Sequence, residues 1–235
     1  MKTVVMIPTY NEKDNILPLI DRINNMGIDN LEILVVDDNS PDGTWCIVEE
    51  KIKNTPNLRL LNRGRRRGRG FAGIDGFRRA LAMGADFVIE MDGDFSHDPS
   101  YIPDFLEAAK DSDLVIGSRF VPGGSNRRQS AARNLVTKFA RLYLRAILGF
   151  RMKDPTSGYR CFRKETLRKI ELETLKSACP FIVTETLHRC LRNNLKVVEI
   201  PITFNDRAAG ESKLGSGRLY IKYLFKALKL RLHVF

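Results

Sequence analysis

The sequence lacks any long hydrophobic run. Its 235 residues contain no stretch approaching the roughly 18 consecutive apolar residues that a membrane-spanning helix needs. The apolar run at the N-terminus stops at Pro8, which is too short for the core of a signal peptide. We therefore expect a chain that does not cross a membrane by itself.

Cysteine is scarce and has no informative spacing. The four cysteines show neither the C-x-x-C pattern of metal and redox sites nor the framework of a small secreted domain. They are Cys46, Cys161, Cys179 and Cys190. We expect reduced thiols and a reducing, cytosolic compartment.

Acidic residues are outnumbered. The chain has 28 Asp and Glu against 39 Lys and Arg, a formal net charge of +11. This excess predicts an anionic partner, which is a nucleic acid, a nucleotide or a membrane surface that carries anionic lipid. With 43% hydrophobic and 29% charged residues, the composition is typical of a folded protein and excludes a disordered one.

Apolar, β-branched runs alternate with stretches of helical periodicity. The expected strands are 3–8, 31–36, 58–61, 86–91 and 113–117, and the expected helices are 12–25, 42–54, 70–83 and 99–110. This alternation predicts one α/β domain with a doubly wound, mainly parallel sheet. After residue 120 it stops, and an Arg-rich helical stretch follows at about 129–148. The second half is therefore expected to be an acceptor or specificity region added to a nucleotide-binding first half.

Acidic side chains follow the expected strands, at the edge where ligands bind to such sheets. Asp92 and Asp94 are the sharpest case. Residues two apart in an extended segment point to the same side, so these two offer a pair of carboxylates to one Mg²⁺ or Mn²⁺. The alternative is a simple turn that ends the strand.

A second acidic cluster follows the second expected strand. Asp38 is expected to accept hydrogen bonds from a nucleobase or ribose. Ser40 or Asp42 is expected to cap the helix that follows.

The segment Gly68–Gly73 matches the G-x-G-x-x-G pattern. It follows the third expected strand instead of opening the first βα unit, so it does not predict NAD binding. Because it continues an arginine run that begins at Arg63, we expect a loop that faces phosphate, with a solvated arginine-rich turn as the alternative.

Two further basic sets indicate two anionic groups to be held. They are Arg119, Arg127, Arg128 and Arg133, and then Arg207, Ser212 and Lys213. A scattered, solvated charge face is the alternative. His97 and His188 are each isolated in the sequence, and we assign neither a role.

The last segment, Arg218 to Phe235, has the pattern of an amphipathic helix. Its cations Arg218, Lys222, Lys226 and Lys229 fall on one face. Such a helix lies in a membrane interface, or it packs on the domain with its lysines in water. Both interpretations remain open at the level of the sequence.

Six segments taken in order resemble the family 2 glycosyltransferases, and among them the polyprenol (dolichol) phosphate mannosyltransferases. They are Pro8-Thr9-Tyr10-Asn11-Glu12, Asp37 to Thr44, Asp92-Gly93-Asp94, Gly117-Ser118-Arg119-Phe120, Asp154-Pro155-Thr156-Ser157-Gly158-Tyr159-Arg160, and Asp206-Arg207 through Lys213-Leu214. The resemblance covers about residues 3 to 215. It implies a GT-A (Rossmann-like) catalytic domain at 1–215, followed by a membrane-interface helix at 216–235.

The resemblance also implies a set of site residues. The nucleotide sugar would be bound by Pro8, Tyr10, Glu12, Val36, Asp38 and Gly93. Asp92 and Asp94 would hold the metal on the donor diphosphate. Arg119 and Arg133 would grip the acceptor phosphate, and Arg207 and Lys213 would close over the diphosphate or the acceptor. Gly93 departs from the Ala that the family often has between the two aspartates, and Ser96 stands where some members carry Gln, so the motif leaves a third protein ligand to the metal open.

The function implied is the inverting transfer of mannose from GDP-mannose to polyprenyl phosphate, at the cytosolic face of a membrane. A phosphate monoester has a second pKa of about 6, so it arrives as a deprotonated nucleophile and no general base is needed. Relatives can carry C-terminal transmembrane segments, which this sequence lacks. Membrane attachment is then left to the last helix, to a partner such as a small membrane-anchoring subunit, or to a segment outside this sequence.

Two alternatives remain. The first is the transfer of glucose or an N-acetylhexosamine from a UDP-sugar, or transfer to a hydroxyl acceptor with Glu185 as the base. The second is a basic nucleic-acid-binding protein. It is disfavoured because no aromatic residues are interspersed among the arginines of the run that begins at Arg63.

Overall fold

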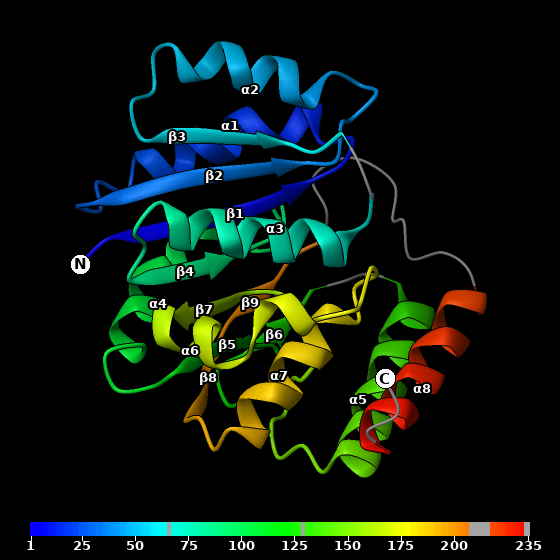
Figure 1. Ribbon diagram of the computed structural model, residues 1–235. Coiled ribbons are helices and arrows are strands. Elements are labelled where there is room, and N and C mark those ends of the chain that lie inside the picture. Colours follow the sequence, from blue (N-terminus) through cyan, green and yellow to red (C-terminus); the bar gives the residue numbers. More distant parts are fainter. Residues whose placement is uncertain (65–66, 128–129, 207–216, 233–235) are drawn as a thin grey trace.

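A seven-stranded sheet forms the centre of the structure (Figure 1). The computed structural model describes residues 1–64, 67–127, 130–206 and 217–232, and of residues 132, 133 and 217–221 it describes only the backbone. The strand order is β3-β2-β1-β4-β7-β5-β8, and all strands run in the same direction except β7, which is antiparallel to β4 and β5. The mainly parallel sheet expected from the sequence is confirmed.

The strands are β1 (Thr3–Thr9), β2 (Leu31–Asp37), β3 (Leu58–Asn62), β4 (Phe87–Glu90), β5 (Leu114–Ser118), β6 (Ser125–Asn126), β7 (Arg160–Arg163), β8 (Val197–Pro201) and β9 (Thr203–Phe204). The helices are α1 (Lys13–Asn24), α2 (Thr44–Ile52), α3 (Arg69–Ala82), the 3₁₀ turn η1 (Pro99–Tyr101), α4 (Ile102–Ala108), α5 (Ala131–Leu148), α6 (Lys164–Lys169), the 3₁₀ turn η2 (Leu172–Thr174), α7 (Ile182–Arg192) and α8 (Gly217–Arg231).

Helices cover both faces of the sheet, which explains why its central strands are apolar throughout. Successive side chains of a strand point to opposite faces. Val4 and Met6 of β1 join a core cluster with α3 and α7, whereas Val5 and Ile7 join a second cluster with α1 and α4. Both faces are therefore dry, as is typical of parallel sheets.

The helices expected in the first half are present, with ends within a few residues of the expected ones. The start of the fourth helical segment follows from its sequence. Asp98 accepts a hydrogen bond from the backbone N–H of Ser100 at 2.9 Å, and Pro99 takes the first position, where no intrahelical hydrogen bond is lost. The Arg-rich stretch expected at about 129–148 is α5.

The antiparallel strand β7 was not expected. It spans only four residues and inserts between β4 and β5. Because β7 runs in the opposite direction, it begins at the sheet edge where β4 and β5 end. Arg160 is in register with Glu90 as a result. The segment that precedes β7 is thereby brought to the same edge as the acidic turn after β4.

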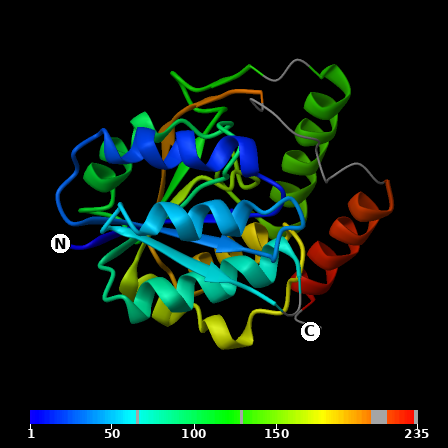
Figure 2. The ribbon, with the colours of Figure 1, turned by 90° about the horizontal axis from the view of Figure 1, so that it is seen from above.

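Helix α8 packs on the domain beside α5, and Figures 1 and 2 show the two helices side by side. Tyr223 packs edge-to-face on Phe181 and hydrogen-bonds to Thr184 of α7. Ala227 and Leu230 are buried. Phe225 on the other side is 62% exposed, so α8 is docked on one face and apolar on part of its outer face as well. In the described part of the chain, no helix is both long and apolar enough to cross a membrane.

All four cysteines are free thiols, as expected. Burial raises the pKa of Cys190 to about 12 and the pKa of Cys161 well above its usual range. These two are inert at neutral pH.

The docking of α8 is testable by truncating one side chain on each of its faces. Tyr223→Ala removes packing on Phe181, so it should lower the free energy of unfolding by about 3 kcal/mol in urea titrations. Phe225→Ala, the matched control on the outer face, should change it by less than about 0.5 kcal/mol. Equal effects at the two positions would contradict the docked arrangement.

Candidate active site

The acidic turn after β4 has a fixed shape. Asp94 is buried, and its Oδ1 accepts hydrogen bonds from the Ser96 backbone N–H at 3.1 Å and from Ser96 Oγ at 2.6 Å. The backbone N–H of Asp92 donates to Nδ1 of His97 at 3.0 Å. The Asp92 side chain stays 38% exposed. The turn therefore presents one accessible and one buried carboxylate, two residues apart.

His97 holds this turn in place, a role that the sequence did not reveal. The ring is buried, stacks on Tyr159 with 4.9 Å between centroids, and packs edge-to-face on Phe204. Burial lowers its pKa, against the pull of Asp92 and Asp94. A neutral ring suits a nitrogen that accepts from the Asp92 N–H.

The two carboxylates fit a divalent cation that prefers oxygen. Such ions bind through one or two carboxylates and take their remaining ligands from water and substrate phosphates. In the described residues, no group of three or more His, Cys, Asp and Glu could hold a metal. The protein would thus contribute Asp92 and Asp94, and the donor diphosphate would complete the shell.

An arginine that the sequence analysis placed in a phosphate-facing loop lies beside this turn. Arg69 Nη1 donates to Oε1 of Glu90 at 2.7 Å, and its Nη2 lies 3.5 Å from Oδ1 of Asp92. Glu90 is buried at the end of β4. Neither Arg69 nor Glu90 was identified as a site residue, because only the fold brings the start of α3 to the end of β4.

The residues expected around the nucleotide meet at the ends of β1 and β2. Pro8 and Val36 are register partners on these strands. The Arg67 guanidinium lies over the Tyr10 ring, with 5.8 Å between Arg67 Cζ and the ring centroid. The Glu12 backbone N–H donates to Oγ1 of Thr44 at 3.0 Å. The structure thus brings these expected nucleotide residues to one edge of the sheet. Contact between them and a nucleotide remains a prediction.

The Asp38 carboxylate binds other groups of the protein. Its carboxylate pairs with Arg63 and accepts the backbone N–H of Gly68 at 2.7 Å, and its side chain is only 7% exposed. Asp37 is likewise buried and accepts hydrogen bonds from Thr9 and Ser40. Asp38 therefore anchors the start of the arginine-rich segment to β2, and contact with a nucleotide remains a prediction.

Gly68 and Gly70 of the G-x-G-x-x-G pattern pack closely against protein, and an approach of this segment to phosphate stays a prediction. A Cβ on Gly70 would lie 1.7 Å from the Ser177 carbonyl oxygen, and the Gly70 N–H donates to the Ala178 carbonyl at 3.0 Å. Gly68 has φ +140°, and a Cβ there would lie 2.5 Å from the Ala178 oxygen. Arg63 and Arg69 both pair with carboxylates of the protein, Arg63 with Asp38 and Arg69 with Glu90.

Arg119 forms a buried, bidentate ion pair with Asp154. Its Nε and Nη2 donate to the Asp154 carboxylate at 2.7 and 2.8 Å, and Nη2 also donates to Thr156 Oγ1 at 2.9 Å. Burial acts to raise the pKa of Asp154, but the charge and hydrogen bonds of Arg119 outweigh it and lower that pKa below 3.8. Its role toward an acceptor phosphate stays a prediction, and the geometry makes it a clamp on the segment before β7.

Arg160 completes that clamp. It is fully buried, and its guanidinium donates to the carbonyl oxygens of Pro155, Ser157 and Val183. Burial lowers its pKa. The Asp154–Arg160 motif quoted in the sequence therefore fixes its own loop against α7.

Glu185 was considered as a base for a hydroxyl acceptor. It is 2% exposed, and its two oxygens accept the backbone N–H groups of Lys176 and Ser177 at 3.2 Å each. The structure thus shows it as the anchor of the loop on which Gly70 packs.

Several expected basic residues cannot be placed. Arg133 lies in α5, but its side chain is not among the described ones. Arg128, Arg207, Ser212 and Lys213 lie outside the described residues. Arg127 is exposed, and its backbone N–H donates to the Phe204 carbonyl at 2.8 Å.

The fold is that of the GT-A glycosyltransferases. A crystal structure of glucosyl-3-phosphoglycerate synthase from Mycobacterium tuberculosis, in complex with Mn²⁺, UDP and glucosyl-3-phosphoglycerate, matches with a TM-score of 0.71 and 21% identity. The match covers all of this chain and 81% of that one. It shows that the GT-A fold expected from the sequence is present.

The family follows from sequence. Residues 4–171 match the model of glycosyl transferase family 2, and the chain belongs to this family of enzymes. It is 39% identical over 217 residues to an undecaprenyl-phosphate mannosyltransferase of Micrococcus luteus, covering 92% of this chain and 89% of that protein. It is 38% identical over 220 residues to a polyprenol monophosphomannose synthase of Mycolicibacterium smegmatis, with 93% and 83% covered. A dolichol-phosphate mannosyltransferase of Pyrococcus furiosus is 39% identical over 236 residues, covering 97% of this chain and 64% of that protein.

The Arg119–Asp154 pair is testable through stability. Asp154→Asn leaves a buried guanidinium without its counter-charge, so unfolding free energy should fall by about 3 kcal/mol or more at pH 7. Because the pKa of Asp154 is lowered in the folded state, its contribution is present above the ordinary value of 3.8 and is lost as pH falls through the folded pKa. The gap between wild type and variant should therefore shrink below pH 3.8.

Lys110→Gln serves as the control, since it breaks the exposed pair with Glu107. Urea titrations should show a loss below about 1 kcal/mol for this variant. A loss as small for Asp154→Asn would refute the clamp.

Proposed function

We propose that this enzyme transfers mannose from GDP-mannose to polyprenyl phosphate with inversion, giving β-linked polyprenyl-phosphate mannose. The carrying observation is the Asp92-Gly93-Asp94 turn, which lies at the carboxyl edge of a GT-A sheet beside the expected nucleotide residues. The names of the relatives support the sugar and the acceptor. The donor nucleotide and the stereochemical course rest on the family resemblance.

The proposed reaction needs a site for a divalent cation at the leaving diphosphate and no general base. A bound Mg²⁺ or Mn²⁺ would supply charge neutralisation at the leaving diphosphate. Asp92 and Asp94 would hold it, and the Ser96 and His97 hydrogen bonds keep their turn fixed, so little reorganisation is needed when the donor binds. The phosphate acceptor attacks as an anion and needs no protein base. Glu185, the residue considered as a base for a hydroxyl acceptor, accepts hydrogen bonds from backbone N–H groups instead.

The acceptor lipid would reach the site along α5 and α8. Neither helix contains Asp or Glu. The apolar side chains that face solvent here are more than a third exposed: Leu135, Phe139 and Leu142 on α5, Phe225 and Leu228 on α8, and Leu232 directly after α8. We call these six residues the apolar face. Cations beside apolar side chains on a helix are typical of binding to an anionic membrane interface.

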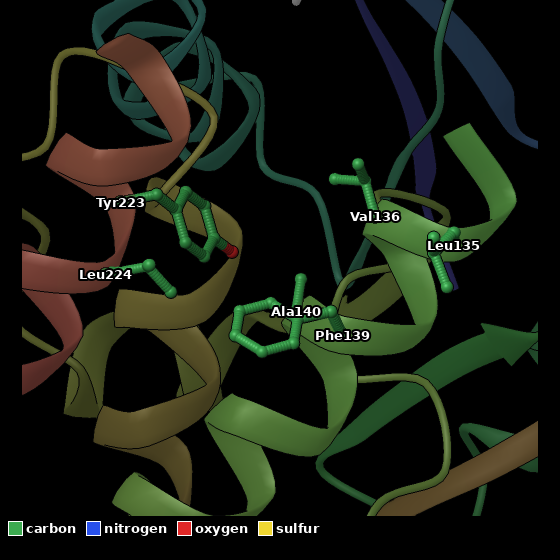
Figure 3. A pocket seen from close by; sticks show the side chains of 6 residues that line it. All are labelled: Leu135, Val136, Phe139, Ala140, Tyr223 and Leu224. Atoms are coloured by element: carbon green, nitrogen blue, oxygen red, sulfur yellow. The ribbon is translucent and has the colours of Figure 1, made fainter. Parts of the chain in front are cut away.

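A groove between the two helices suits an isoprenoid chain. Figure 3 shows its lining, in which side chains of α5 and α8 face one another across a hollow of about 420 Å³. The lining consists of apolar and aromatic side chains: Leu135, Val136, Phe139, Ala140, Tyr223 and Leu224. A peripheral enzyme at the cytoplasmic face would take polyprenyl phosphate from the bilayer here. The segment 216–235, within which α8 spans Gly217–Arg231, would then serve as the membrane-interface region, with a small anchoring subunit as an optional partner.

The donor could instead be a UDP-sugar. The structure of the M. tuberculosis synthase contains UDP, so the fold accepts that nucleotide. The mechanism of the acidic turn would be the same, and only the base and sugar contacts would differ.

The metal role of the turn is tested by Asp94→Asn. The rate of transfer from GDP-mannose to polyprenyl phosphate, followed as radiolabel in an organic extract, should fall about a hundredfold or more, as when other groups that stabilise developing charge are removed. Asp104→Asn, at an exposed position of α4, should leave the rate unchanged. Wild-type rates in a folded Asp94→Asn protein would remove the metal assignment.

The membrane role of the apolar face is tested by vesicle flotation. Leu142→Asp removes an apolar contact and adds a negative charge, so affinity for vesicles with anionic lipid should fall about tenfold or more. Asn25→Asp adds the same charge at an exposed position beside α1 and should have little effect. If both variants bind like wild type, the apolar face does not contact the bilayer.

A further inference from the structure

Arg69 lies between the metal turn and a second, deeper carboxylate. Its guanidinium donates to Glu90 at 2.7 Å and lies 3.5 Å from Asp92 Oδ1, and its side chain is 22% exposed. Glu90 is 3% exposed, and Arg69 is the one ion-pair partner that the described residues give it. A buried carboxylate requires such a cation.

The backbone around Arg69 fixes this position. Gly70 packs against Ser177, and its N–H donates to the Ala178 carbonyl, so the first turn of α3 cannot move away from that loop. Burial acts to lower the pKa of Arg69, but the charges of Glu90 and Asp92 outweigh it and raise that pKa. Arg69 therefore carries a permanent positive charge next to the accessible oxygen of the turn.

A glycine leaves room beside the same groups. A Cβ on Gly158 would lie 3.8 Å from Nη2 of Arg69, 3.8 Å from Cε1 of His97 and 4.0 Å from Oδ1 of Asp92. Without that side chain, the guanidinium has space to shift while Nη1 stays on Glu90.

We propose that Arg69 is an internal counter-cation for Asp92, which a divalent cation must displace and which then pairs with the donor diphosphate. Two cations at one carboxylate oxygen repel each other, so the metal binds weakly alone. A diphosphate offers Arg69 a new anionic partner and the metal further ligands. Metal and nucleotide thus bind with positive coupling, and each tightens the other by the same factor. The proposal rests on the proposed function for the nucleotide, whereas the competition at Asp92 does not.

The experiment is a titration of Mn²⁺ followed by the electron paramagnetic resonance signal of the free ion. Without nucleotide, Arg69→Gln should tighten Mn²⁺ binding about tenfold, because the competing charge is gone. With GDP present, the wild type should gain more Mn²⁺ affinity than the variant does. Arg78→Gln is the control, since Arg78 lies on the same helix but pairs with Asp75 and Glu173. It should behave as wild type in both titrations.

A second pair of variants covers the case in which unpaired Glu90 unfolds the protein. Arg69→Gln on a Glu90→Gln background should again tighten nucleotide-free Mn²⁺ binding relative to Glu90→Gln alone. Unchanged or weaker binding without nucleotide in both comparisons would overturn the role of Arg69. If binding tightens without nucleotide but GDP has no effect on any variant, the counter-cation stands and the proposed donor fails.

Discussion

Compensation of buried charge organises this protein. The parallel strands end at one edge of the sheet, where Asp38, Glu90 and Asp154 are almost completely buried. Each carboxylate meets one arginine, which is Arg63, Arg69 or Arg119 respectively. Removing one partner from such a pair leaves a charge with neither water nor counter-ion, which costs several kcal/mol. The loops that carry the site are therefore tied to the sheet by ion pairs.

This arrangement separates residues that build the edge from residues that remain accessible. The loops are held by Asp38, Arg119 and Arg160. The side chain of Asp92, in contrast, is 38% exposed. The basic character of the chain serves two purposes as a result. Some arginines neutralise internal carboxylates, and the cations on α5 and α8 lie on helices without acidic residues. The proposed reaction, which joins two anionic substrates at a bilayer, would use both sets of cations.

The sequence predicted the first half of the fold well because strand and helix periodicities there are strong and regular. Strand β7 was missed because four residues carry too little pattern, and because its direction depends on a partner distant in the chain. The turn with Asp92 and Asp94 was singled out by its spacing and by the other acidic clusters at the same sheet edge, and its metal role stays a prediction. Roles of arginines were harder to predict, since a sequence does not show whether a guanidinium meets a ligand or a protein carboxylate. Arg119 and Asp154 illustrate this, being 35 residues apart and bonded through two nitrogens. Gly68 and Gly70 match a phosphate-loop pattern, yet a protein carbonyl is what they approach.

The central claim is the transfer of a particular sugar to a lipid phosphate, and a donor comparison tests it most directly. The protein is incubated with polyprenyl phosphate in detergent, Mn²⁺ or Mg²⁺, and radiolabelled GDP-mannose, UDP-glucose or UDP-N-acetylglucosamine in separate reactions. The account predicts label in the organic extract from GDP-mannose alone, lost when a chelator is added. Label from a UDP-sugar instead, or label from GDP-mannose that persists with chelator, would contradict it.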